Sequence, residues 1–269
     1  IRLSLVGSEM CIRDRIGTVM RDILLFVVIF SLVPLAIMRP YIGIYAWSWL
    51  SYMNPHRLTW GIAFNFPFAQ VLGAATLAGF ILQALLNKQF PKLPREREVY
   101  FLVLLWILFL ISTFFAIYPQ EAWAEFSKIS KILIFTFLTI MLIDDEKKLR
   151  YLMIIIAISF GFYGIKGGVF SILTGGTNRV WGPIGTFFED NNAFGLAINM
   201  ALPILFYLAQ AEDNKKIKLM LYGTFLLSIL AVIFTYSRGA FLGLVTVLFF
   251  ISLSLSLIHI SEPTRLRRI

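Results

Sequence analysis

Long runs of apolar residues recur along the chain, separated by short polar segments. The runs cover residues 23–38, 66–86, 99–117, 130–143, 151–173, 193–210, 217–236 and 240–258. A helix that crosses a bilayer needs about 20 mainly apolar residues, and continuous runs differ from the alternating pattern of a membrane β-barrel. The sequence therefore predicts an all-α fold, a polytopic membrane helical bundle with about eight transmembrane helices.

Two shorter apolar segments affect this count. Segment 41–53 follows Arg39-Pro40 and is rich in Trp and Tyr, so it is a ninth crossing, a re-entrant piece or an interfacial helix. We expect it not to cross, because Arg21 then stays on the more basic side of the membrane. Segment 130–143 is short as well, but the amphipathic stretch around Trp123 and Phe126 can extend it.

The loop charges predict the orientation. Loops 87–98, 144–150 and 211–218 lie on one side of the predicted bundle and together hold ten Lys and Arg residues. The opposite side holds Arg57, Lys128, Lys131, Arg179 and Arg238. Because cytoplasmic loops carry an excess of cations, the ten-cation side should be cytoplasmic. Loop 174–192 and the turn at 236–240 should then face outward.

Composition narrows the function classes. Of 269 residues, 59% are apolar and 14% are charged, and the mean hydropathy is +0.81. Soluble domains have about 45–50% apolar and about 25% charged residues. These values exclude a soluble globular enzyme, a disordered chain and a nucleic-acid-binding module. One Cys and two His residues exclude an intrachain disulfide and argue against a zinc cluster, so no metal and no cofactor is expected.

The two ends of the chain differ from its middle. Residues 1–19 and 252–269 resemble translated sequencing adapter, which has to be excluded from fold reasoning. We expect the native segment to be 20–251, starting at Met20 and forming one transmembrane domain that is the N-terminal part of a longer protein. The exclusion removes Cys11 and His259 from consideration.

The most polar segment between two apolar runs is 174–192, TGGTNRVWGPIGTFFEDNN. It carries Arg179, and Asp190 or Asn191 should cap the next helix, with Asn192 beside them. The amino-terminal end of that helix can receive a phosphate. The alternative is an ordinary capped loop whose arginine lies at the lipid headgroups.

A second polar element, Tyr236-Ser237-Arg238-Gly239-Ala240, joins two apolar runs with almost no loop. A guanidinium can hold a phosphate through a bidentate fork, Ser237 can support it, and Gly239 allows a close approach. The alternative is that Arg238 ends a helix and contacts a lipid headgroup.

Further candidates lie in Asn54-Pro55-His56-Arg57, which precedes Trp60, and in the stretch 161–168. His56 is the one credible titratable base of the native segment, although a lone His beside Pro is more often structural. The glycines of 161–168 predict close helix packing. Lys166 among them either extends toward the headgroups or joins an anion site. The sequence lacks a P-loop, G-x-S-x-G, H-E-x-x-H and a paired Asp-x-Asp.

These residues carry a resemblance to a known family. The resembling positions are Arg179, Gly185-Thr186-Phe187, Asn192, Gly195, Pro203 and Thr235 through Ala240, together with Arg39 to Gly43 and Met53 to Trp60. The pattern resembles the O-antigen ligase and polymerase superfamily. It is most similar to the O-glycosylation ligases of the exosortase A-associated system, over about residues 20–251.

The resemblance implies an O-antigen ligase-like fold in the bacterial inner membrane, with its active face in the periplasm. Such a glycosyltransferase moves a glycan from an undecaprenyl-diphosphate carrier to a protein hydroxyl or a lipid acceptor. Arg179 and Arg238 match the arginines that bind the diphosphate. The family's catalytic histidine lies in a later periplasmic loop, so no catalytic residue is expected here and this fragment should be inactive alone. No metal is needed, because guanidinium groups neutralise the diphosphate.

Other functions remain open at this point. A lipid-linked glycan polymerase would use the same carrier. A flippase or transporter of lipid-linked glycan should show an inverted repeat and broken helices. We find no repeat, although Pro34, Pro67 and Pro203 could break helices. A purely structural membrane subunit is the third alternative.

Overall fold

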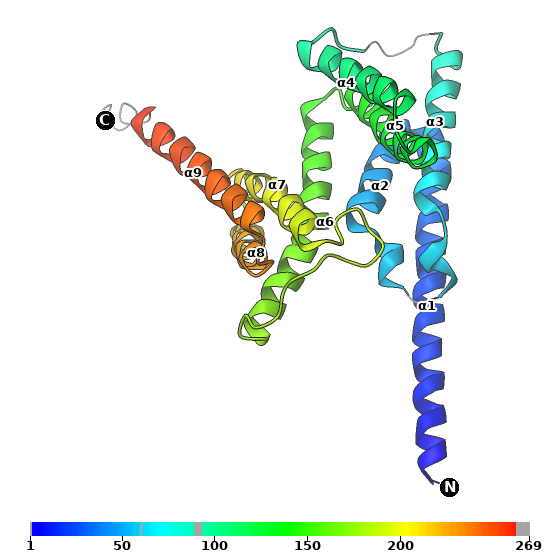
Figure 1. Cartoon of the computed structure of the whole chain (residues 1–269), viewed down its shortest axis with the longest axis vertical. Coiled ribbons are helices and arrows are strands. Elements are labelled where there is room, and N and C mark those ends of the chain that lie inside the picture. The colour runs from blue at the N-terminus through cyan, green and yellow to red at the C-terminus, as the bar shows by residue number, and fades with distance from the viewer. Residues whose placement is uncertain (1, 60, 89–92, 262–269) are drawn as a thin grey trace. The chain divides into compact units, whose positions relative to one another are not determined.

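The computed structural model describes residues 2–59, 61–88 and 93–261, and the side chains of 19–59, 61–88 and 93–254. Trp60, the middle of loop 87–98 and the side chains of Cys11 and His259 lie outside this part. The described chain is helical (Figure 1). Its α-helices are α1 (Arg2–Met38), α2 (Pro40–Met53), α3 (Phe68–Leu86), α4 (Arg97–Phe114), α5 (Pro119–Leu142), α6 (Glu146–Leu173), α7 (Asn191–Gln210), α8 (Lys215–Ile233) and α9 (Arg238–Ser261). Two 3₁₀ turns, η1 (Pro55–Leu58) and η2 (Ile62–Asn65), connect α2 to α3.

Six of these helices are long and apolar enough to cross a membrane, which indicates a membrane protein. They are Val19–Met38 of α1, Phe68–Leu86, Arg97–Phe114, Glu146–Leu173, Asn191–Gln210 and Lys215–Ile233. The prediction of long apolar helices is therefore confirmed. The full count of eight and a ligase-like arrangement remain predictions.

The two shorter apolar segments, 41–53 and 130–143, are both helical. Segment 41–53 is α2, whose 14 residues span about 21 Å at 1.5 Å each, less than the roughly 30 Å hydrocarbon core. Run 130–143 is the second half of α5, which extends back through Trp123 to Pro119. The last apolar run forms α9, of which Arg238–Ser254 is a shorter apolar helix.

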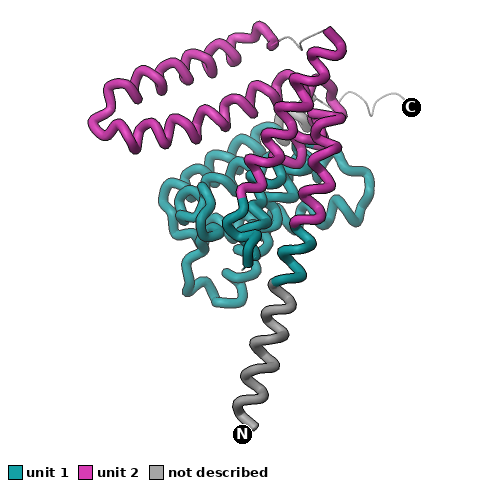
Figure 2. Tube along the Cα trace, turned by 90° about the vertical axis from the view of Figure 1, so that its right-hand side faces the viewer, with its two compact units in different colours: residues 1–25, 48–66, 152–269 teal, residues 26–47, 67–151 magenta. Residues whose placement is uncertain are grey.

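The chain divides into two compact units, which are coloured separately in Figure 2. Unit 1 comprises residues 1–25, 48–66 and 152–269, and unit 2 comprises 26–47 and 67–151. Each unit is therefore assembled from segments that are distant in the sequence. The expected single domain 20–251 contains parts of both.

Unit 2 is built around α3 and α5. Gly73 of α3 lies against Phe135 of α5, and the Phe135 ring stacks on Trp47 with centroids 4.2 Å apart. The pair α4 and α5 is joined by a hydrogen bond of 2.9 Å from Trp106 Nε1 to Ser130 Oγ. None of the residues predicted to form a site lies in this unit.

Unit 1 holds the candidate site and a core centred on α7, with Phe194, Leu202 and Leu205 fully buried. Three glycines of α6 face α8: Gly161 lies against the Thr224 side chain, Gly164 against the Ser228 side chain and Gly168 against the Leu227 backbone. The close packing predicted for 161–168 is confirmed.

Candidate functional site

Hydrogen bonds attach loop 174–190 to the turn between α8 and α9. The Val180 amide donates to the Phe234 carbonyl at 3.0 Å, and the Tyr236 hydroxyl donates to the Gly176 carbonyl. These bonds bring the end of α6, the start of α7 and the α8–α9 turn to one end of unit 1. The exposed side chains of Arg179 and Arg238 therefore lie at the same end of unit 1.

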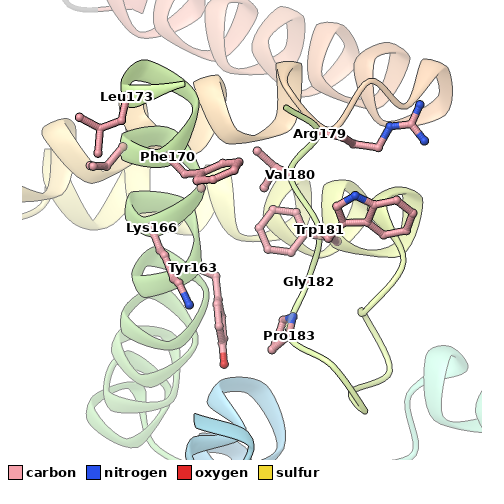
Figure 3. A pocket seen from close by; sticks show the side chains of 12 residues that line it. Tyr163, Lys166, Phe170, Leu173, Arg179, Val180, Trp181, Gly182 and Pro183 are labelled. Carbon is pink, nitrogen blue, oxygen red and sulfur yellow. The ribbon is translucent and has the colours of Figure 1, made fainter. Parts of the chain in front are cut away.

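A pocket of about 440 Å³ opens between α6 and the 179–183 segment (Figure 3). Its walls are mostly apolar, with Phe170, Leu173 and Trp181 among them, and Lys166 and Arg179 also line it. The Arg179 guanidinium carbon lies 5.8 Å from the centre of the Trp181 ring. In Figure 3 this guanidinium points away from Lys166, so the two cations do not converge on one point.

A second cavity, about 540 Å³ in volume, is a groove between α7 and α9. Asn192 lines it at the start of α7, and Ser237 and Gly239, which flank Arg238 in the sequence, line it at the start of α9. A Cβ added at Gly239 would meet no atom within 4 Å. The glycine is thus not required for packing within the described residues, and it leaves this end of the groove open.

The geometry at the start of α7 argues against a phosphate site there. Asp190, one of the two residues predicted to cap this helix, is the cap. Its Oδ1 accepts hydrogen bonds from the amides of Asn192 at 2.8 Å and Ala193 at 3.4 Å. Bonds from the Asn192 backbone and side chain lower the pKa of Asp190. A carboxylate therefore occupies the positive end of the helix, and an anionic ligand would be repelled there.

The other supporting residues are committed to internal bonds. The Asn191 side chain is buried and donates to the Thr235 carbonyl at 2.9 Å. Asn192 Nδ2 donates to Asp190 Oδ1 at 2.9 Å. Ser237 Oγ accepts from the Ala240 amide at 3.1 Å and so caps α9. The Asn191 bond joins the start of α7 to the α8–α9 turn, and the other two bonds are local to each helix start.

Arg57 contacts the same loop from the other side. Its guanidinium lies against Gly185, where an added Cβ would be 3.0 Å from Nη1, and its Cζ is 4.6 Å from the centre of the Phe64 ring. Arg57 Nε is buried and has no hydrogen-bond partner among the described residues. The element 54–57 therefore supports the loop through a guanidinium–backbone contact.

His56 is neutral at physiological pH. Burial, followed by the charge of Arg57, lowers the pKa of His56 from 6.5 to about 4. Its carbonyl accepts the Thr59 hydroxyl at 2.8 Å, and the preceding Met53 carbonyl accepts the Tyr163 hydroxyl of α6. These contacts place His56 in a fixed turn that is attached to α6.

Two buried polar residues were missed by the sequence analysis. Asn199 lies inside α7 and lines the groove, and its Oδ1 has no hydrogen-bond partner among the described residues. Asp22 of α1 is buried, with one carboxylate oxygen accepting the Ala63 amide at 3.3 Å. The signal for each was a polar residue at the edge of or within an apolar run, which is a functional candidate in a membrane helix.

Comparison with known proteins identifies the family. Residues 20–213 match a family of unknown function, DUF5935. The chain belongs to this family. The matched part contains Arg57, Lys166 and Arg179 and ends before Arg238. No curated protein and no solved structure matches the chain.

Proposed function

We propose that this chain belongs to a membrane glycan transferase of the O-antigen ligase type. It binds an undecaprenyl-diphosphate-linked glycan at the periplasmic face of the bacterial inner membrane. The glycan is then transferred to a protein hydroxyl or a lipid acceptor. The observation that carries the proposal is the position of Arg179 and Arg238 at one end of unit 1, on elements joined by the bonds of Val180 and Tyr236.

The position of Arg238 supports an anionic ligand. It is the first residue of α9, where a cation is disfavoured by the helix dipole by about 0.3–1 kcal/mol. Its side chain is exposed, and no ion pair to it is found among the described residues. A bound diphosphate would offset the unfavourable position and accept a bidentate hydrogen bond.

The surroundings of Arg179 suit the same ligand. A polyprenyl diphosphate joins an apolar chain and a glycan through two phosphates. The pocket beside Arg179 presents Phe170, Leu173 and the exposed Trp181, which offer apolar and aromatic surface next to a cation. The role of the guanidinium groups is to neutralise the diphosphate as it leaves the glycan, the electrostatic contribution that is often largest in catalysis.

No catalytic base is assigned among the described residues. Burial and the charge of Arg57 lower the pKa of His56 to about 4, which makes its imidazole a weak base. We therefore assign carrier binding to the described part of the chain, and we assign proton transfer to none of its residues.

Carrier binding tests the proposal. The full chain in nanodiscs is titrated with undecaprenyl diphosphate, undecaprenyl monophosphate and undecaprenol, with binding read by native mass spectrometry. We expect the diphosphate to bind most tightly. Because a hydrogen bond to a charged group contributes about 1.5–3 kcal/mol, Arg179→Gln and Arg238→Gln should each weaken diphosphate binding by about 10- to 150-fold.

Lys215→Gln is the matched control, because Lys215 is an exposed cation at the start of α8, the opposite end of that helix. It should leave diphosphate affinity unchanged. Equal binding of undecaprenol and the diphosphate, or equal losses in Lys215→Gln and Arg238→Gln, would refute the assigned role of the two arginines.

A further inference from the structure

Helices α1 and α3 run side by side in the same direction within unit 2 (Figure 1). Near the start of α3, the ring centroids of Phe26 and Phe68 are 4.9 Å apart. Further along, Gly79 of α3 lies directly against the α1 backbone. In the last turn of both helices, the Gln83 side chain donates a hydrogen bond to the Met38 carbonyl. Residues with rising numbers on α1 therefore meet residues with rising numbers on α3.

Helix α2 runs along α3 in the opposite direction. Gly43, near the start of α2, lies against the Thr76 side chain. One turn later, Trp47 Cδ1 would be 3.7 Å from a Cβ added at Gly73. Helix α2 begins beside the last turn of α3, where α1 ends, and the turns η1 and η2 that follow it lead to Phe68, the first residue of α3. The two ends of α2 therefore lie at opposite ends of α3.

The direction and burial of α2 bear on the three forms considered for segment 41–53. A re-entrant helix would bring both of its ends to the same side of the membrane, which the pairing with α3 contradicts. An interfacial helix would keep one face exposed, but none of the fourteen residues of α2, all of which the structure describes, is exposed. Ile44 and Leu50 are 0% and 1% exposed. A crossing helix that is shorter than the hydrocarbon core is accommodated by local thinning of the bilayer at a modest cost.

A contact in unit 1 points to the same arrangement independently. Asp22, near the start of the apolar span of α1, is 8% exposed and accepts a hydrogen bond from the Ala63 amide of η2 at 3.3 Å. Its carboxylate also lies directly against Gly61. If segment 41–53 did not cross, a hydrocarbon core of about 30 Å would separate Asp22 from the outward-facing turn 54–66. The bond requires that both lie on the same side of the membrane.

We propose that α2 crosses the membrane, so that the Val19 end of the α1 span lies on the extracytoplasmic side and Arg39 lies on the cytoplasmic side. The cations of loop 87–98, which follows α3, predict that the end of α3 is cytoplasmic, and α1 ends beside it. This orientation of α1 is the reverse of the one expected from Arg21. Loop charge does not decide between the two, because exchanging Arg21 and Arg39 leaves the number of cations on each side unchanged. The inference does not depend on the proposed function.

The outer end of the α1 span then supports the face that holds the candidate site. Asp22 fixes η2 through the Ala63 amide. Arg57 of the adjoining turn η1 contacts Gly185 in loop 174–190. All of these residues belong to unit 1. An acidic residue in a membrane span, which is costly and a functional candidate by default, is thus explained by a bond to the turns that contact the loop.

Labelling of single cysteines in bacterial spheroplasts tests the orientation. The full chain carries Cys11→Ser, which removes its one native thiol, and one new cysteine at an exposed position, either Met20→Cys or Arg39→Cys. A membrane-impermeant maleimide is added before or after permeabilisation. We expect Met20→Cys to be labelled fully in sealed spheroplasts and Arg39→Cys to be labelled only after permeabilisation.

Two further exposed positions calibrate the assay, because either orientation of α1 leaves them on the same side. Ile62→Cys should be labelled in sealed spheroplasts, and Lys147→Cys only after permeabilisation. Protection of Met20→Cys in sealed spheroplasts, or labelling of Arg39→Cys in them, would overturn the proposal. An exchange of the results for Ile62→Cys and Lys147→Cys would reverse the whole chain and would overturn it as well. Labelling does not report on carrier binding, so a failed carrier titration leaves this result unchanged.

Discussion

Replacing Gly168 by alanine tests the packing of α6 on α8. A Cβ at Gly168 would lie 2.3 Å from the Leu227 carbonyl oxygen and 3.0 Å from its Cα. These are backbone atoms of a helix and cannot rotate away. Comfortable contacts between carbon atoms begin near 3.5 Å, so the two helices would have to separate by about 1 Å. Overpacking of this kind costs about 1–3 kcal/mol.

The matched control is Gly223→Ala in α8, where an added Cβ would meet nothing within 4 Å. Alanine is favoured over glycine inside a helix by about 0.8–1 kcal/mol, and both variants gain this term. The difference between them therefore isolates the contact. We expect Gly168→Ala to be less stable than Gly223→Ala by about 1–3 kcal/mol.

Reversible unfolding in mixed micelles, followed by circular dichroism, measures this difference. Gly164→Ala adds an intermediate case, because the nearest atom to its new Cβ is the Ser228 hydroxyl oxygen, the end of a side chain that can rotate. We expect the order of stability Gly223→Ala, Gly164→Ala, Gly168→Ala. If the Gly168→Ala and Gly223→Ala chains were equally stable, the inferred backbone contact between α6 and α8 would be wrong.

The remaining predictions concern the loop and its neighbours. An alanine in the left-handed conformation costs about 1–2 kcal/mol, and Gly185→Ala should destabilise the chain by more than this, because φ is +75° and Arg57 lies in contact. Gly175→Ala is the control, because Gly175 has φ +59° and no neighbour, so it carries only the backbone cost. Equal losses of stability in thermal unfolding would contradict the contact with Arg57. His56 should titrate near pH 4 by NMR. Because folding lowers the pKa of His56, the free energy of unfolding should fall as the pH drops from about 6.5 toward 4. His56→Gln should remove this pH dependence. If the pH dependence were unchanged in the variant, it would come from another group. Asp190→Ala should lower the unfolding midpoint while Asp190→Asn, which keeps the capping oxygen, should not; equal midpoints would show that the cap is unimportant.

Several local features could be predicted because they depend on neighbouring residues. The cap at Asp190 follows from an Asp-Asn pair directly before an apolar run, and Pro119 starts α5 as prolines often start helices. The glycines of 161–168 were spaced along one helix face, which indicated close packing. The boundaries were less accurate: run 217–236 ends as α8 at Ile233, because the chain turns there to bond with Val180.

The candidate site was predicted only in part. The grouping of Arg179 with Arg238 was predicted from topology, and it is supported by contacts that no spacing reveals, such as the bond of Tyr236 to Gly176. The contact of Arg57 with Gly185 joins residues 128 positions apart and has no local signal. The phosphate site predicted at the start of α7 is disfavoured, because the Asp190 carboxylate that caps the helix repels an anion.

The sequence by itself determined that this protein is helical and apolar enough for a membrane. Such properties depend on the length of apolar runs and on the need of each backbone to bond within its own helix. Only the tertiary structure decided which polar groups are already used and which are still open. Asn191 and Ser237 are bonded within the chain, whereas Arg238 is exposed and Asn199 Oδ1 is left without a partner in the described residues. The physical reason is that a hydrogen bond is satisfied by whatever comes close in space, and in this chain the partners are often more than 40 residues away.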